Sequence, residues 1–199
     1  MYLRIFIAKL LFLLGGLLLM TLFGLGELSA WLTAGHGLPV DLDVPQLSMT
    51  DTESGDTVSF PAVTRQRSPT LLFLGFLRCR SVCPTALRNM EGLSQLASQQ
   101  RLRLLFVSVD PEHDSVDKMR KMSALYPSVK MLRPLSTEQV SALLRALNGR
   151  ATNPEVGLPE HTGFFYLLDS GGKARFLYTS FPGEEPIRAD LALLERNLN

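Results

Sequence analysis

The chain has 199 residues, with 20 lysines and arginines against 19 aspartates and glutamates, a formal net charge of +1. Such an even balance argues against a nucleic acid or another polyanion as partner. The only two cysteines, Cys79 and Cys83, stand four residues apart, so thiol redox or soft-metal chemistry would have to centre on them.

The first predicted element is an apolar helix near the N-terminus. Leu10–Gly26 contains seventeen residues without a charge, which at ~1.5 Å per residue is about 26 Å, close to the ~30 Å hydrocarbon core of a bilayer. Arg4 and Lys9 precede this stretch and Glu27 follows it, so the positive-inside rule places the N-terminus in the cytoplasm. We predict a single-pass anchor over residues 1–34 in the inner membrane of the cell, with the remainder in the periplasm. A cleaved signal peptide is the alternative.

The rest of the chain is predicted to be a glycine-rich tether at residues 35–42 and one domain at residues 43–199. The domain opens with a hairpin whose strands are Gln46–Thr50 and Thr57–Phe60, with Gly55 in the turn. Leu71–Phe76 is uninterrupted apolar sequence, which is typical of a strand covered on both faces.

The cysteines follow that strand and open a predicted helix, with Pro84 at its first position. A second buried strand, Leu104–Val109, comes after the helix and ends at Asp110. Strand, helix and strand together predict a right-handed parallel crossover.

The remaining elements alternate helices with strands, as an α/β domain requires. In chain order they are a helix at Val116–Leu125, a strand at Val129–Leu132, a helix opened by a Ser136-x-x-Gln139 capping box, strands at Phe164–Leu168 and Ala174–Tyr178, and a helix after Pro186. We predict a mixed sheet, with the thiols just past the carboxyl end of a central strand, where open α/β sheets bind their ligands.

Two thiols at the start of a helix can form a structural disulfide, a redox-active dithiol or a clamp for a soft metal. The positive end of the helix lowers thiol pKa values and favours the thiolate that the last two roles need. Arg78 and Arg80 flank Cys79, and we expect their charges to depress the cysteine pKa further.

Three motifs in order resemble the Sco/SenC family: a strand followed by Cys-x-x-x-Cys-Pro, then Phe106–Asp114, then Glu160–Asp169. The resemblance spans about Leu71 to Tyr178 and agrees with a single N-terminal anchor. It implies a thioredoxin-like fold and a membrane-tethered metallochaperone that assists assembly of the binuclear copper site of cytochrome c oxidase. It also implies copper bound by Cys79, Cys83 and His161, with the oxidase copper-site subunit and a copper donor protein as partners.

The sequence departs from the family pattern between the cysteines, where it reads Arg80-Ser81-Val82 and has gained a base and lost an acid. A second hypothesis therefore stays open: a thiol-disulfide oxidoreductase, with Cys79 and Cys83 as its catalytic residues, that reduces cysteines of the copper-site subunit or of another exported protein. Whether the protein is an enzyme depends on which hypothesis holds.

Two further residues sit near the predicted site. His113 lies between Glu112 and Asp114, and we interpret it as a solvated surface residue. Asp110, in the turn after the second buried strand, either caps nearby backbone or supports the thiol loop.

Overall fold

The computed structural model describes residues 15–16, 37–64, 68–80, 82–147 and 163–197 of the chain. The chain divides into two compact units, Met1–Gly35 and His36–Asn199, and the second is described below. Within the described ranges, no helix is long and apolar enough to cross a membrane. Apart from Gly15 and Gly16, the predicted anchor lies outside those ranges.

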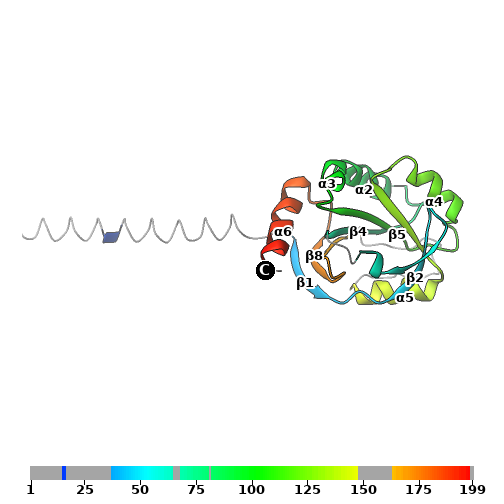
Figure 1. Ribbon diagram of the computed structural model, residues 1–199, viewed down its shortest axis with the longest axis horizontal. Coiled ribbons are helices and arrows are strands. Elements are labelled where there is room, and N and C mark those ends of the chain that lie inside the picture. The colour runs from blue at the N-terminus through cyan, green and yellow to red at the C-terminus, as the bar shows by residue number, and fades with distance from the viewer. Residues whose placement is uncertain (1–14, 17–36, 65–67, 81, 148–162, 198–199) are drawn as a thin grey trace, which may run out of the picture. The chain divides into compact units, whose positions relative to one another are not determined.

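A mixed sheet of eight strands runs through the unit in the order β1-β8-β7-β4-β5-β6-β2-β3 (Figure 1). The strands are β1 Leu38–Leu42, β2 Leu47–Asp51, β3 Thr57–Phe60, β4 Thr70–Gly75, β5 Arg103–Ser108, β6 Val129–Pro134, β7 Phe165–Leu168 and β8 Ala174–Tyr178. β4, β5 and β6 run parallel, and every other neighbouring pair is antiparallel. The predicted mixed sheet and its parallel crossover are confirmed.

Helices cover both faces of this sheet, and α5 lies on the opposite face from α2, α3 and α4 (Figure 1). The helical elements are the short η1 Ala62–Thr64, then α2 Val82–Glu91, α3 Ser94–Ser98, α4 Val116–Ser123, α5 Thr137–Ala146 and α6 Glu184–Asn197. This arrangement of a mixed sheet flanked by helices is the predicted thioredoxin-like fold.

The helix that follows the thiols differs from the prediction. It begins at Val82, before Pro84, and it ends at Glu91 because Gly92 and Leu93 turn the chain, with the Leu93 N–H donating to the Met90 carbonyl at 2.8 Å. A second short helix, α3, follows this turn.

The capping box predicted for α5 does not form. The Ser136 side chain makes no capping hydrogen bond, and the Gln139 side chain instead accepts the Leu135 N–H at 2.9 Å. The Gln139 side chain therefore binds the backbone N–H of Leu135, one residue before the Ser136 N–H that the Ser-x-x-Gln pattern predicts.

Residues 38–42, which lie in the predicted tether, form the outer strand β1 and pair with β8. The Gly37 N–H donates to the fully buried Asp190 carboxylate at 2.9 Å, and the Tyr178 hydroxyl donates to the same oxygen at 2.6 Å. A Cβ on Gly37 would stand 2.8 Å from the Phe176 Cβ. The start of the unit is thus fixed against β8 and α6.

The core centres on β4, whose six residues are all buried. The Phe73 ring lies 4.7 Å from that of Phe165 and 6.1 Å from that of Phe106, which joins three neighbouring strands through aromatic contacts. Because β4, β5 and β6 run parallel, their carboxyl ends meet at one edge of the sheet. This edge carries the thiols.

Candidate functional site: a buried thiol pair at the carboxyl edge of the sheet

The two thiols lie where β4 passes into α2. Cys79 precedes α2, and Cys83 lies in its first turn. Both are reduced, and they are 9% and 3% exposed, respectively. The Cys83 N–H points at the Cys79 sulfur, with a nitrogen-to-sulfur distance of 3.4 Å. The structure therefore confirms that the thiols lie together past the end of a central strand.

Gly75, the last residue of β4, makes the close approach of the Cys83 thiol possible. A Cβ at this position would lie 2.9 Å from the Cys83 sulfur and 2.8 Å from both the Phe73 and the Phe106 ring. Real Cβ atoms essentially never come within 3.0 Å of such neighbours. The glycine is therefore the reason that the thiol can pack directly against the strand.

Burial raises the pKa of the Cys83 thiol far above its usual range, and the neighbouring Cys79 and Asp114 add to the rise. For Cys83 this is the opposite of the depression we expected from Arg78 and Arg80. The reason is partly geometric, because the Arg78 guanidinium is engaged by Asp110. At neutral pH the Cys83 sulfur keeps its proton until a metal or a bond to another sulfur displaces it.

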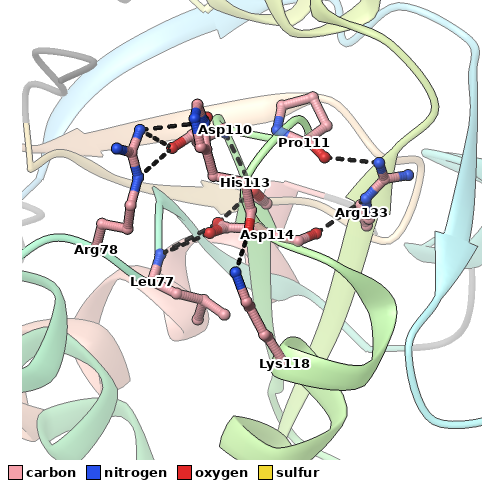
Figure 2. Close-up of polar contacts among 9 residues, drawn as sticks. Leu77, Arg78, Asp110, Pro111, His113, Asp114, Lys118 and Arg133 are labelled. Atoms are coloured by element: carbon pink, nitrogen blue, oxygen red, sulfur yellow. Dashed lines mark hydrogen bonds and ion pairs between the residues drawn. The ribbon is translucent and has the colours of Figure 1, made fainter. Parts of the chain in front are cut away.

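Arg78, Asp110 and His113 form a closed cluster beside the thiol loop (Figure 2). Arg78 donates to one Asp110 oxygen from Nε at 3.1 Å and from Nη2 at 2.7 Å. The other Asp110 oxygen lies 2.7 Å from His113 Nδ1, and the same ring nitrogen lies 3.1 Å from Arg78 Nη2. His113 Nδ1 donates to the carboxylate when it carries a hydrogen and accepts from the guanidinium when it does not. Burial raises the pKa of Asp110, but the hydrogen bonds from His113 and Arg78 outweigh it and leave the pKa below its ordinary value.

These contacts refine two predictions. His113 is half exposed, as a surface residue would be, but its ring is oriented by Asp110 and not by the adjacent Glu112 or Asp114. The Asp110 carboxylate binds Arg78, the residue before Cys79, while its backbone carbonyl accepts the N–H groups of His113 and Asp114.

Asp114 is a site residue that sequence reasoning missed. Its carboxylate is fully buried and accepts the Leu77 N–H at 3.1 and 3.3 Å and the Ser108 hydroxyl at 2.7 Å. Burial raises the pKa of Asp114 in spite of these hydrogen bonds. The available signal was its position four residues after Asp110, at the edge where β5 ends.

Basic side chains hold the backbone of the same turn, residues 110–114. Arg133 donates from Nε to the Asp114 carbonyl at 2.9 Å and from Nη2 to the Pro111 carbonyl at 2.6 Å. Lys118 Nζ donates to the His113 carbonyl at 3.1 Å (Figure 2). The turn is thus a rigid support, fixed from β6 and α4, for the loop that carries Cys79.

His161, the third predicted metal ligand, lies outside the described residues. The chain is described again from Gly163, which has a φ of +64° and whose Cβ, if present, would stand 3.2 Å from a Val82 methyl group. The segment that begins two residues after His161 therefore passes close to Val82, which lies between the cysteines. In the part of the chain that the structure describes, no three His, Cys, Asp or Glu side chains gather as a metal cluster.

Comparison with known proteins gives a consistent result. A sequence profile of the SCO1/SenC family matches residues 52–196. A SCO2-like protein of Rickettsia felis is 25% identical over 126 residues, which is 57% of this chain and 60% of that protein. The chain thus spans about 60% of the length of this curated relative.

Two solved structures have the same fold. A SCO1/SenC family lipoprotein from Bacillus anthracis superposes with a TM-score of 0.67 at 21% identity, over 81% of this chain and 98% of that one. The copper-bound ScoI of Bradyrhizobium japonicum superposes with a TM-score of 0.60 at 23% identity, over 77% and 98% of the two chains.

Proposed function

Because the chain belongs to the SCO1/SenC family, we propose that it is a membrane-tethered metallochaperone that binds copper and assists assembly of the binuclear copper site of cytochrome c oxidase. Copper is the cargo, and Cys79, Cys83 and His161 are its ligands. A copper donor protein loads the site, and the copper-site subunit of the oxidase receives the metal.

The observation that carries this proposal is the pair of reduced thiols at the carboxyl edge of the sheet, with the Cys83 N–H 3.4 Å from the Cys79 sulfur. Cu(I) is a soft ion that prefers thiolates and accepts imidazole as a further ligand. Metal binding also allows Cys83 to act as a thiolate in spite of its high pKa, because the metal takes the place of the thiol proton.

The short distance between Gly163 and Val82 supports His161 as the third ligand. Consecutive Cα atoms are 3.8 Å apart, so the His161 Cα lies within about 7.6 Å of the Gly163 Cα. A separation of this size permits an imidazole at residue 161 to reach the loop between the cysteines.

The second candidate function is thiol-disulfide exchange with the cysteines of the copper-site subunit or of another exported protein. It is favoured by the unequal exposure of the thiols, 9% for Cys79 and 3% for Cys83. A mixed disulfide would form at the more accessible Cys79, and Cys83 would then attack it and release the reduced partner.

The anchor and the location belong to the same proposal. The apolar run Leu10–Gly26 and its charged flanks support a single-pass membrane anchor at residues 1–34, with the tether, residues 35–42, and the domain, residues 43–199, in the periplasm. A tether of this kind keeps the copper site near a membrane-bound oxidase.

The decisive experiment is metal analysis of the full chain in detergent, reduced and then loaded with Cu(I). We expect about one copper per chain, with loss of binding in Cys79→Ser and Cys83→Ser and much weaker binding in His161→Ala. His36→Ala is the matched control, because His36 belongs to the predicted tether and is not a proposed ligand. If His161→Ala binds copper like the unaltered protein, His161 is not a ligand and thiol exchange becomes the better account.

A further inference from the structure

The residues before Cys79 form a tight turn that delivers the first thiol to the site. The Cys79 N–H donates to the Phe76 carbonyl at 3.3 Å, which closes a four-residue turn with Leu77 and Arg78 at its centre. The position of the Cys79 sulfur relative to Cys83 depends on how firmly this turn is held.

Both central residues of the turn are fixed by aspartates of the 110–114 segment. Asp114 accepts the Leu77 N–H on the buried side, and Asp110 accepts two N–H groups of Arg78 on the exposed side (Figure 2). The two aspartates are themselves held in place, since the Asp114 N–H donates to the Asp110 carbonyl at 2.9 Å. The turn is therefore clamped at two points by one rigid support.

We propose that Arg78 is a positioning residue for the thiol pair, acting through Asp110 to fix the turn that presents Cys79 to Cys83. This inference deepens the proposed copper function and rests on it for the copper readout. The redox readout described below does not depend on copper.

The geometry of the contact favours this role over a purely electrostatic one. Asp110 is 8% exposed, and the Arg78 guanidinium reaches it with two nitrogens, which fixes the orientation of the side chain as well as its charge. His113 holds the second Asp110 oxygen and so prevents the carboxylate from rotating away. The guanidinium is directed at the carboxylate although the Arg78 side chain is 40% exposed.

Arg80 provides a matched control on the other side of Cys79. It carries the same charge one residue from the thiol, it is exposed, and it makes no hydrogen bond or ion pair to another described residue. A substitution of Arg80 removes a nearby positive charge without removing a clamp. A substitution of Arg78 removes both.

The test measures two properties of the full chain in detergent for the unaltered protein, Arg78→Ala, Arg78→Lys, Asp110→Asn, Arg80→Ala and the double variant Arg78→Ala with Asp110→Asn. The first property is Cu(I) affinity, from competition with a chromophoric chelator. The second is the equilibrium between the dithiol and its disulfide in glutathione buffers, in which glutathione disulfide takes up the two electrons and two protons that the thiols release.

A charge-assisted hydrogen bond at a partly exposed site is worth about a factor of ten in an equilibrium constant. We therefore expect Arg78→Ala to lower Cu(I) affinity and the equilibrium constant for disulfide formation by about tenfold each. The second change corresponds to a shift of about 30 mV in the reduction potential of the thiol pair. Arg78→Lys should recover part of the loss, and Arg80→Ala should change both quantities less than threefold. The double variant should lose no more than the worse of its two single variants, because both remove the same contact.

Two outcomes would overturn the proposal. One is Arg78→Ala behaving like Arg80→Ala in both measurements, which would reduce Arg78 to a surface charge. The other is a double variant whose loss is the product of the two single losses, which would show that Arg78 and Asp110 act independently. If the unaltered protein binds no copper, the proposed function fails, and the glutathione equilibrium alone decides the role of Arg78.

Discussion

Replacing Gly75 with alanine tests the claim that the thiol site depends on direct contact between Cys83 and β4. The added Cβ would lie 2.9 Å from the Cys83 sulfur and 2.8 Å from the Phe73 and Phe106 rings. Ordinary contacts between such atoms are about 3.5–4.0 Å, so each neighbour must retreat by about 0.6–1.2 Å.

The neighbours have little room for this movement. Phe73 and Phe106 are both 0% exposed, and Cys83 lies in the first turn of α2. Inserting one methyl group into a well-packed core costs about 1–3 kcal/mol. For a unit of this size, a loss of about 2 kcal/mol lowers Tm by about 4–8 °C.

The measurements are urea unfolding for stability and the Cu(I) competition assay for the site. Gly171→Ala is the control, since Gly171 is exposed and its added Cβ would meet only the Asp169 side chain, at 3.1 Å. We expect Gly75→Ala to lose stability and also copper affinity, because the methyl group displaces the Cys83 sulfur, and Gly171→Ala to change neither by much. A Gly75→Ala protein with unaltered stability and copper affinity would refute the packing argument.

Three other predictions follow from separate features. The raised pKa of Asp114 means that the folded state holds this proton more tightly than the unfolded state, so the group adds stability as pH falls through its folded pKa. The free energy of unfolding of Asp114→Asn, measured in urea, should therefore lie further below that of the unaltered protein at pH 5 than at pH 7. A difference between the two proteins that does not change with pH would contradict the direction of the pKa shift. Tyr178→Phe removes a donor to the buried Asp190 and should lower the free energy of unfolding by about 1–3 kcal/mol. Tyr126→Phe, at a half-buried tyrosine, should change it little. Equal losses in the two variants would show that the Tyr178 hydroxyl contributes nothing specific. Carbonate-washed membranes should retain the full chain through Leu10–Gly26, and release of a shortened soluble species would indicate a cleaved signal peptide instead.

Elements with strong local patterns were predictable from the sequence. The apolar runs gave β4 and β5 to within one residue, and the alternating Ala174–Tyr178 segment is β8 as predicted. The first stretch, Leu71–Phe76, follows the polar Thr70. The second, Leu104–Val109, lies between Arg103 and Asp110 and is interrupted only by Ser108. The local sequence is therefore enough to locate both strands.

β1 could not be recognised in the same way. Leu38–Leu42 is short, contains a proline, and becomes a strand only because it pairs with β8, more than 130 residues away in the sequence. Local patterns carry no information about a partner at that distance, so the segment looked like a tether.

The candidate site was likewise predictable only where its features depend on neighbouring sequence. The position of Cys79 and Cys83 follows from the strand that precedes them, and this part of the prediction is confirmed. The orientation of Arg78 depends on Asp110, thirty-two residues later in the sequence. The arginines are predicted to lower the pKa of at least one thiol; burial dominates at Cys83 and raises its pKa, so this prediction now applies to Cys79 alone.

The outer strands of the sheet have a consequence for the protein at high local concentration. An exposed strand edge offers unpaired backbone groups to a second copy of the chain, and proline, which has no N–H, interrupts such pairing. Here β1 contains Pro39, and Pro61 directly follows β3 at the other edge, a strand of only four residues. Both margins of the sheet are thereby poor templates for intermolecular strand addition, which favours a dispersed protein even where many copies crowd together.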